Sequence, residues 1–175
     1  SLGPLGRKGG SAKNPLGQLV TLAWLEQIPD AEVAINNRGA LRMSFEPGDI
    51  TVQNIIGLLP FNNTVVRVTL SKAQLLEVFA NPQTLATGAE VKDGKVFVRG
   101  KELADGASVR VLINDFMYYG GDGYRFKEYD PKPLMLGIPW RAPLYDYLRD
   151  RREKKTKISA ATLRKAWDFI TQGAK

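Results

Sequence analysis

The 175-residue chain contains neither cysteine nor histidine. Their absence excludes thiol catalysis, disulfide bonds, zinc sites built from cysteine and histidine, and nucleophiles that a histidine base activates. Any metal site would have to consist of carboxylates and amides. The lack of cysteine is compatible with an oxidising compartment.

Long apolar runs are missing as well. No stretch approaches the roughly 18 residues of a membrane span, and the sequence contains no signal peptide. Apolar residues make up 43% of the chain, which suffices for one domain with a hydrophobic core. Residues 1–12 are rich in glycine and without periodicity. We expect them to be a linker or an expression remnant outside the fold.

The chain has fewer acidic than basic residues, 18 against 25, and its net charge is +7. Much of the surplus lies in residues 151–157, where five basic side chains accompany one acidic side chain. Such a run is commonly a solvated linker between helices. The alternative is a contact with a phosphate-rich partner or an anionic membrane surface.

Helical and strand patterns alternate along the chain, and a hairpin is expected around Asp93-Gly94 because this pair readily adopts positive φ. The mixture predicts an α/β or α+β fold with a mixed sheet. The apolar stripe of the last helix is expected to pack on the body of the domain. We predict helices over 15–28, 51–59, 71–80, 143–150 and 159–172, strands over 31–36, 64–70 and 109–114, a hairpin over 90–98, and an irregular stretch over 130–139.

The strand pattern of 109–114 runs directly into the segment Asp115-Phe116-Met117-Tyr118-Tyr119-Gly120-Gly121-Asp122-Gly123-Tyr124. Its glycines allow positive φ and close backbone approach, its aromatic rings offer flat faces, and Asp122 offers a hydrogen-bond acceptor. The segment is therefore either a ligand-holding loop or a tight turn whose aromatic rings belong to the core. These ten residues alone favour neither interpretation.

Two more segments accompany this one in a fixed order, Asn37-Arg38-Gly39-Ala40-Leu41-Arg42 and Leu59-Pro60-Phe61-Asn62-Asn63-Thr64. Together with Gly48-Asp49-Ile50-Thr51 they resemble the C-terminal domain of the 5'-nucleotidase family, which includes periplasmic UDP-sugar hydrolases and cell-surface ecto-5'-nucleotidases. The family's versions of the two segments read Asn-Gly-Gly-Gly-Ile-Arg and Leu-Pro-Phe-Gly-Asn-Thr. The resemblance covers about residues 13–150. It implies mixed sheets in a layered α/β/β/α arrangement. Residues 151–175 lie outside the resemblance, and we expect them to form a basic linker and a terminal helix packed on the domain.

The resemblance also implies a nucleotide-binding face. Phe61 and Phe116 would clamp the nucleobase between two rings, because stacking on an aromatic ring tolerates any base. Asn63 would hydrogen-bond the edge of the base. The structural alternative is that the two phenylalanines are core rings and that Asn63 is a turn residue.

The sugar and phosphate would be held by a second group of residues that the resemblance implies. Asp122 would accept hydrogen bonds from the ribose hydroxyls, and Asn37 would contact the base or the sugar. Arg42 would face the phosphate with its planar guanidinium. Arg38 and Ala40 stand where the family has glycines, so that Arg38 either narrows the pocket or adds a phosphate contact. The structural alternatives are a turn residue for Asn37, a brace within its own loop for Asp122, and a solvated side chain for Arg42.

Catalysis in this family belongs to a separate N-terminal metallophosphoesterase domain that holds two divalent metals. Because the chain has no histidine, the resemblance implies that it binds nucleotides without a cofactor of its own and hydrolyses nothing by itself. The implied whole is a periplasmic, secreted or cell-surface hydrolase of two domains that move relative to each other. The alternatives are a stand-alone nucleotide-binding module and a basic nucleic-acid-binding protein.

Overall fold

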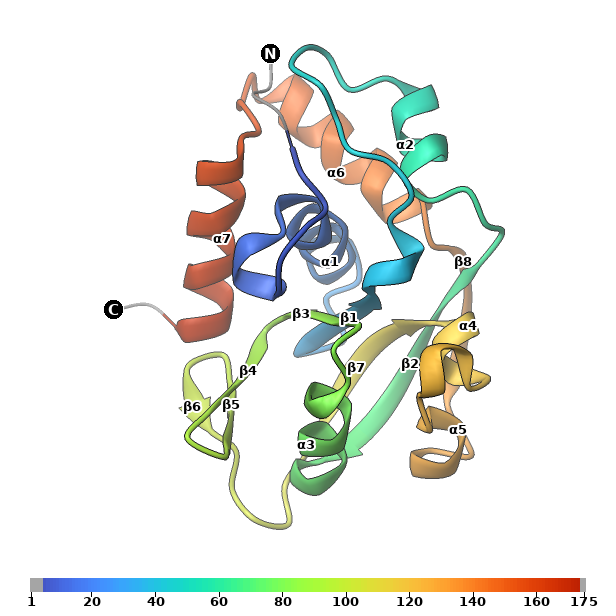
Figure 1. Ribbon diagram of the computed structural model, residues 1–175, viewed down its shortest axis with the longest axis vertical. Helices are drawn as coiled ribbons and strands as arrows, with labels where there is room; N and C mark the ends of the chain where they lie inside the picture. The colour runs from blue at the N-terminus through green and yellow to red at the C-terminus, as the bar shows by residue number, and fades with distance from the viewer. Residues whose placement is uncertain (1–4, 174–175) are drawn as a thin grey trace.

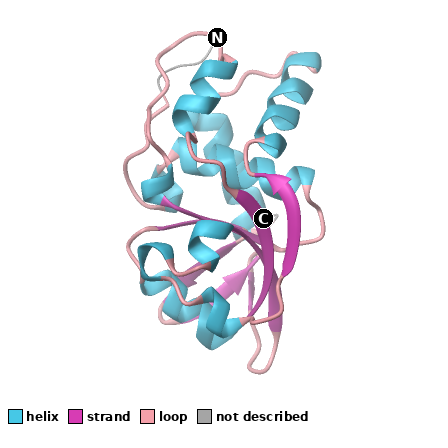
Figure 2. Cartoon of the chain, turned by 90° about the vertical axis from the view of Figure 1, so that its right-hand side faces the viewer, coloured by secondary structure: helices cyan, strands magenta, loops and turns pink. Residues whose placement is uncertain are grey.

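A five-stranded mixed sheet runs through the middle of the protein, with helices on both sides (Figures 1 and 2). The computed structural model describes residues 5–173. The strand order is β3-β1-β7-β2-β8, in which β1 and β7 are parallel and the other neighbours antiparallel. The strands are β1 (Val33–Asn37), β2 (Thr64–Ser71), β3 (Thr84–Thr87), β7 (Ser108–Asn114) and β8 (Leu134–Pro139). The predicted α/β class with a mixed sheet is confirmed.

A second, three-stranded sheet contains β4 (Ala89–Lys92), β5 (Lys95–Val98) and β6 (Lys101–Glu102). The turn between β4 and β5 has φ of 49° at Asp93 and 71° at Gly94. Positive φ at both central residues matches the twist of the flanking strands. The predicted hairpin is therefore confirmed.

Side-chain caps fix where the main helices begin. Asn14 accepts a hydrogen bond from the Gly17 backbone N–H, and Thr51, Ser71 and Ser159 form capping boxes at three further helices. The helices are α1 (Pro15–Gln27), α2 (Val52–Leu58), α3 (Lys72–Ala80), α4 (Asp115–Tyr118), α5 (Phe126–Tyr129), α6 (Ala142–Glu153) and α7 (Ala160–Gln172), with 3-10 turns η1 (Ser11–Lys13), η2 (Arg38–Ala40) and η3 (Gly121–Gly123). Among residues 5–173, no helix has both the length and the apolarity to cross a membrane.

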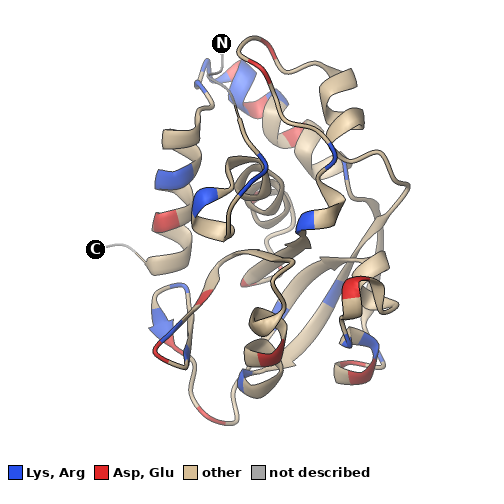
Figure 3. Cartoon of the chain, viewed as in Figure 1, with Lys and Arg blue, Asp and Glu red and all other residues tan. Residues whose placement is uncertain are grey.

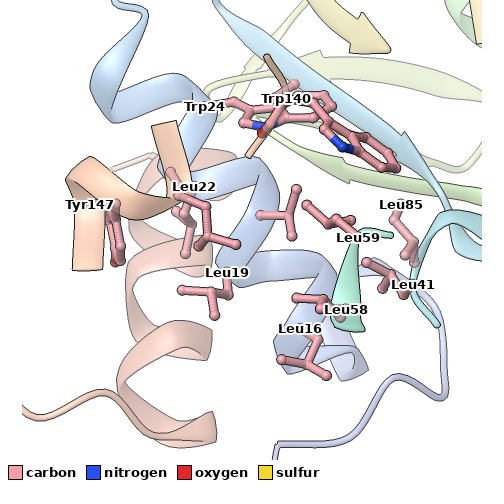
Figure 4. Packing of buried hydrophobic residues seen from close by; sticks show 14 of the residues in the cluster. Leu16, Leu19, Leu22, Trp24, Leu41, Leu58, Leu59, Leu85, Trp140 and Tyr147 are labelled. Atoms are coloured by element: carbon pink, nitrogen blue, oxygen red, sulfur yellow. The ribbon is translucent and has the colours of Figure 1, made fainter. Parts of the chain in front are cut away.

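The five-stranded sheet separates two hydrophobic cores, because successive side chains of a strand point to opposite faces. Leu112 of β7 packs with α1, α6 and α7 on one face, whereas Val111 and Ile113 pack with α3, α5 and the small sheet on the other. Figure 4 shows the first core, where Trp24 of α1 lies beside Trp140. The Trp24 Nε1–H donates to the Trp140 carbonyl oxygen at 2.9 Å, which ties α1 to the end of β8.

Strand β8 corrects the prediction of an irregular stretch over 130–139. Its prolines argued against a strand, since proline cannot donate a hydrogen bond to a sheet ladder. β8 lies at the edge of the sheet and pairs only with β2, with a shift of register between Thr64 and Val66. An edge strand tolerates proline because one side of its backbone needs no partner strand.

The N-terminal segment also differs from the expected linker. Leu5 is fully buried and exchanges two backbone hydrogen bonds with Phe45. The Ser11 hydroxyl accepts from the Ala86 backbone N–H at 2.9 Å. Residues 5–12 are therefore part of the packed structure in spite of their glycines. Residues 1–4 of the predicted linker lie outside the described residues.

Helix α7 covers one end of the first core. Trp167 is buried, and its Nε1–H donates to the Ala86 carbonyl oxygen at 2.7 Å. The Thr171 hydroxyl accepts from the Gly88 backbone N–H at 3.0 Å. Helix α6 continues without a break to Glu153, past the predicted boundary at residue 150, so that the basic run begins inside a helix. The predicted domain limits otherwise stay a prediction.

Candidate functional site

A pocket of about 470 Å³ opens at one edge of the five-stranded sheet. The carboxyl ends of the parallel strands β1 and β7 meet there, together with the amino end of β2, which runs antiparallel to β7. Six residues predicted for the site line this pocket: Asn37, Arg42, Phe61, Asn63, Phe116 and Asp122. Gly39, Ala40, Asn62, Asn114 and Trp140 complete the lining.

Phe61 and Phe116 line the same pocket, although they lie far apart in the chain. The Phe61 side chain comes from the loop before β2 and the Phe116 side chain from α4. Their exposed fractions are 49% and 46%, so neither ring belongs to the core. Two half-exposed aromatic rings in one pocket offer faces on which a flat ligand can stack.

Hydrogen bonds fix the loop that carries Phe61. The Trp140 Nε1–H donates to the Phe61 carbonyl oxygen at 2.9 Å, and the Arg141 guanidinium donates to the Leu59 carbonyl oxygen at 2.7 Å. The Arg42 guanidinium carbon lies 5.8 Å from the centre of the Phe61 ring. The ring therefore stands on a loop that is anchored to β8 and α6.

The ring of Phe116 lies directly over Gly121. A β-carbon built on Gly121 would come within 2.2 Å of the Phe116 ring carbon Cε1. The side chain of Asn114 holds the start of α4 by accepting from the Met117 backbone N–H at 2.9 Å. A side chain at position 121 would therefore force the Phe116 ring to move.

We expect Gly121→Ala to weaken ligand binding in the pocket, because the added methyl group forces the Phe116 ring out of its position. Inserted methyl groups in packed sites cost about 1–3 kcal/mol. Applied to the ring position that binds the ligand, this cost corresponds to an affinity about 5- to 150-fold lower. Calorimetric titration with adenosine measures the effect. The melting temperature serves as the control, and an affinity equal to that of the parent protein would contradict the role given to Gly121.

A chain of amides joins the ends of β1 and β7. The Asn37 Nδ2–H donates to the Asp122 carboxylate at 2.6 Å, and the Asn114 Nδ2–H donates to Asn37 Oδ1 at 3.0 Å and to Asn36 Oδ1 at 2.8 Å. Asp122 has a φ of 54°, and its carbonyl oxygen accepts from Asn81 Nδ2 at 2.9 Å. The Asp122 carboxylate is therefore fixed at the pocket wall and has acceptor capacity left for hydroxyl groups of a ligand.

The side chain of Asn63 is oriented by a neighbouring acid. Its Nδ2–H donates to one oxygen of the Asp115 carboxylate, whose other oxygen accepts from the Thr64 hydroxyl at 3.0 Å. Because a carboxylate only accepts hydrogen bonds, the amide nitrogen of Asn63 must face Asp115. Asn63 Oδ1 has no partner within residues 5–173 and remains available to a ligand.

Arg38 is the one predicted site residue that does not line the pocket. Its backbone N–H donates to the Gln83 carbonyl oxygen at 2.8 Å, and its Nε is buried without a hydrogen-bond partner in the part of the chain that the structure describes. Arg42, in contrast, lines the pocket beside Phe61. The two arginines of residues 37–42 therefore occupy different surroundings.

Tyr124 is the last residue of the aromatic segment, and its side chain is buried. Burial raises the pKa of its phenol to about 12, and the charge of the nearby Asp122 carboxylate acts in the same direction. Its hydroxyl lies 2.9 Å from that of Thr84. The phenol is therefore neutral at physiological pH and braces the turn η3 behind Asp122.

The predicted site residues did not include Asn62, Asn114 and Trp140, which line the pocket, or Asp115, which orients Asn63. Asn114 and Asp115 directly follow the last apolar positions of a strand, where polar side chains gather at a sheet edge. Asn62 occupies the glycine position of the motif that its segment resembles, which was a usable signal. Trp140 follows a proline-rich stretch and had no sequence signal that linked it to Phe61.

The basic run of residues 151–157 covers the end of α6 and the connection to α7, and none of its residues lines the pocket. Figure 3 shows how Lys and Arg are distributed over the chain. Arg151 pairs with Glu26 at 2.6 Å. Arg152, Lys154, Lys155 and Lys157 form no ion pair within residues 5–173. Within the same residues, no group of three or more Asp and Glu side chains is arranged to hold a metal ion.

Comparison with known proteins identifies the family. The family model for the 5'-nucleotidase C-terminal domain matches residues 5–92, half of the chain. The chain belongs to the 5'-nucleotidase C-terminal domain family. The match starts at Leu5, the first residue of the packed N-terminal segment.

Relatives and solved structures agree with this family. A 5'-nucleotidase of Vibrio cholerae is 29% identical over 147 residues, which are 76% of this chain and 26% of the relative. Protein UshA of Yersinia enterocolitica is 31% identical over 62% of this chain and 22% of its own length. The chain thus spans about a quarter of the length of these relatives.

The fold is also found in two solved structures. A 5'-nucleotidase precursor from Thermus thermophilus superposes with a TM-score of 0.74 at 24% identity, covering 85% of this chain and 35% of that protein. NAD nucleotidase from Haemophilus influenzae gives a TM-score of 0.70 at 17% identity, covering 91% of this chain and 35% of that protein. The predicted 5'-nucleotidase C-terminal-domain-like fold is confirmed.

Proposed function

We propose that this domain binds nucleosides and nucleotides in the pocket and acts as the substrate-specificity domain of a metal-dependent 5'-nucleotidase-type hydrolase. The observation that carries the proposal is the presence of two half-exposed rings, Phe61 and Phe116, in one pocket beside the Asn37–Asp122 pair. Stacking between the rings suits a nucleobase. The Asp122 carboxylate suits the ribose hydroxyls, and Arg42 suits the phosphate.

Hydrolysis in this proposal occurs in a metallophosphoesterase domain of the same protein, whose two divalent metals supply water activation. The residues of this chain bind and orient the nucleotide, and a movement of the two domains delivers it to the metals. The proposal places the hydrolase in the periplasm, on the cell surface or in the secreted fraction. Support comes from relatives named 5'-nucleotidase that are about three times as long as this chain, since the match covers 76% of this chain and 26% of the relative.

We expect the isolated chain to bind adenosine and AMP with a dissociation constant in the micromolar to millimolar range. Calorimetry gives the affinity, and NMR shift mapping gives the location. The largest shifts are expected at Phe61 and Phe116, because ring faces contact the base directly. Shifts that avoid both rings, or saturable binding elsewhere, would refute the proposed site.

Arg42→Ala is expected to weaken the binding of AMP about tenfold more than the binding of adenosine, since a charge-assisted hydrogen bond contributes about 1.5–3 kcal/mol. The same pair of titrations is expected to show a smaller phosphate-specific loss for Arg38→Ala, because Arg38 does not line the pocket. Equal losses for both ligands would show that the arginine concerned does not contact the phosphate.

A further inference from the structure

Asn62 lines the pocket between Phe61 and Asn63 and has an exposed side chain. Its Oδ1 accepts a hydrogen bond from Nη2 of Arg141 at 3.1 Å. A guanidinium can only donate, so the amide oxygen of Asn62 must face Arg141. The amide nitrogen then points away from Arg141, and it has no hydrogen-bond partner within residues 5–173.

Arg141 is itself held in place, which keeps this orientation fixed. Its Nη1 donates to the Leu59 carbonyl oxygen at 2.7 Å and to the Phe61 carbonyl oxygen at 3.2 Å. The planar guanidinium therefore bridges the backbone before Asn62 and the side chain of Asn62. A rotation of the amide by 180° would place two donors against each other.

Asn63 carries the opposite orientation. Its amide nitrogen faces Asp115, which leaves the carbonyl oxygen without a partner in the described part of the chain. Asn62 and Asn63, which both line the pocket, thus carry one free donor and one free acceptor on successive residues. This arrangement complements an aromatic heterocycle whose edge carries an acceptor beside a donor.

We propose that Asn62 is a specificity-determining residue that donates a hydrogen bond from Nδ2 to an acceptor on the edge of the stacked base. For a 6-aminopurine the acceptor is a ring nitrogen, and the exocyclic amino group is the matching donor for Asn63. Arg141 acts as a positioning residue for the Asn62 amide. This inference rests on the proposed nucleoside site and specifies which base atoms the site recognises.

The test compares adenosine with 1-deaza-, 3-deaza- and 7-deazaadenosine, each of which replaces one ring nitrogen with C–H. The titrations are carried out well above pH 7, where all four ligands are neutral, so that charge does not enter the comparison. The parent protein is expected to bind one of the three analogues about three- to tenfold more weakly than adenosine, the range that a neutral hydrogen bond supplies. In Asn62→Ala this difference is expected to disappear, while the other analogues keep their ratios.

Asn62→Asp is the matched variant, because aspartate keeps the size of the side chain and the contact with Arg141 but lacks the N–H donor. It should weaken adenosine at least as much as Asn62→Ala does, and it should also abolish the deaza difference. Melting temperatures of both variants should equal that of the parent protein, since the side chain is exposed.

Two failures can be told apart. If adenosine binds and depends on Phe116, but the deaza ratios are the same in the parent protein and in both Asn62 variants, the role of Asn62 is refuted and the nucleoside site stands. If adenosine does not bind the parent protein, the nucleoside site itself is refuted, and the role of Asn62 with it. A deaza difference that disappears in both variants supports the donor role.

Discussion

The Phe116→Ala variant is expected to bind adenosine and AMP about 5- to 150-fold more weakly than the parent protein, because stacking of a base on an aromatic side chain contributes about 1–3 kcal/mol. Phe116 supplies one of the two exposed faces in the pocket. Its loss leaves the base in contact with Phe61 alone. Calorimetric titration measures the change, and at the upper end of the range the binding becomes undetectable.

Tyr119→Ala provides the matched control for this experiment. Tyr119 is a neighbouring aromatic residue with an exposed fraction of 63%, and it does not line the pocket. Its removal is expected to leave the affinity for adenosine unchanged. An equal loss of affinity in the two variants, or full affinity in Phe116→Ala, would argue against stacking on Phe116.

The Trp167→Ala variant is expected to lower the free energy of unfolding by about 3–5 kcal/mol, the usual cost of removing a large buried aromatic side chain. Trp167 has an exposed fraction of 3% and anchors α7 to the rest of the domain. The substitution also leaves the Ala86 carbonyl oxygen without its indole donor. Unfolding in urea, followed by circular dichroism, measures the loss.

Phe169→Ala tests whether the effect is specific to the packed face of α7. Phe169 lies two residues further along the same helix with an exposed fraction of 64%. Its replacement should change the stability by less than about 0.5 kcal/mol, as is usual for surface positions. If Trp167→Ala were as mild as Phe169→Ala, α7 would contribute little to the stability of the domain.

Local rules predicted the elements that local chemistry decides. The caps at Asn14, Thr51 and Ser71 satisfy free backbone donors within a few residues, so that the sequence alone places these helix starts. The Asp93-Gly94 turn follows from the φ preferences of two residues. For such features the residues that specify the structure lie within one turn of the feature itself.

Features that depend on distant partners escaped the sequence reasoning. β8 forms because its backbone pairs with β2 in the sheet, and nothing within residues 134–139 indicates that partner. The Leu5 side chain is buried in the first core and its backbone pairs with that of Phe45, which its glycine-rich neighbours do not indicate. The shared cause is tertiary pairing, which outweighs local propensity at both positions.

The candidate site shows the same division. The resemblance of three segments predicted that Phe61, Phe116 and Asp122 belong to one site, and the structure brings their side chains to one pocket. It did not reveal that Arg141 orients the amide of Asn62 and Asp115 that of Asn63, because these contacts join residues that are 79 and 52 positions apart. The substrate-binding roles themselves stay predictions until ligands are titrated.

Trp140 connects the pocket to the helical core, since its indole holds the Phe61 carbonyl oxygen while its own carbonyl oxygen is held by Trp24. A ligand that fixes Phe61 therefore acts on a loop that is continuous with the interior around α1. A free ligand concentration of 100 times the dissociation constant adds about 2.7 kcal/mol to the stability of the native state. A thermal-shift screen of the bare domain can consequently rank nucleosides by the rise in melting temperature, without any assay of phosphate release.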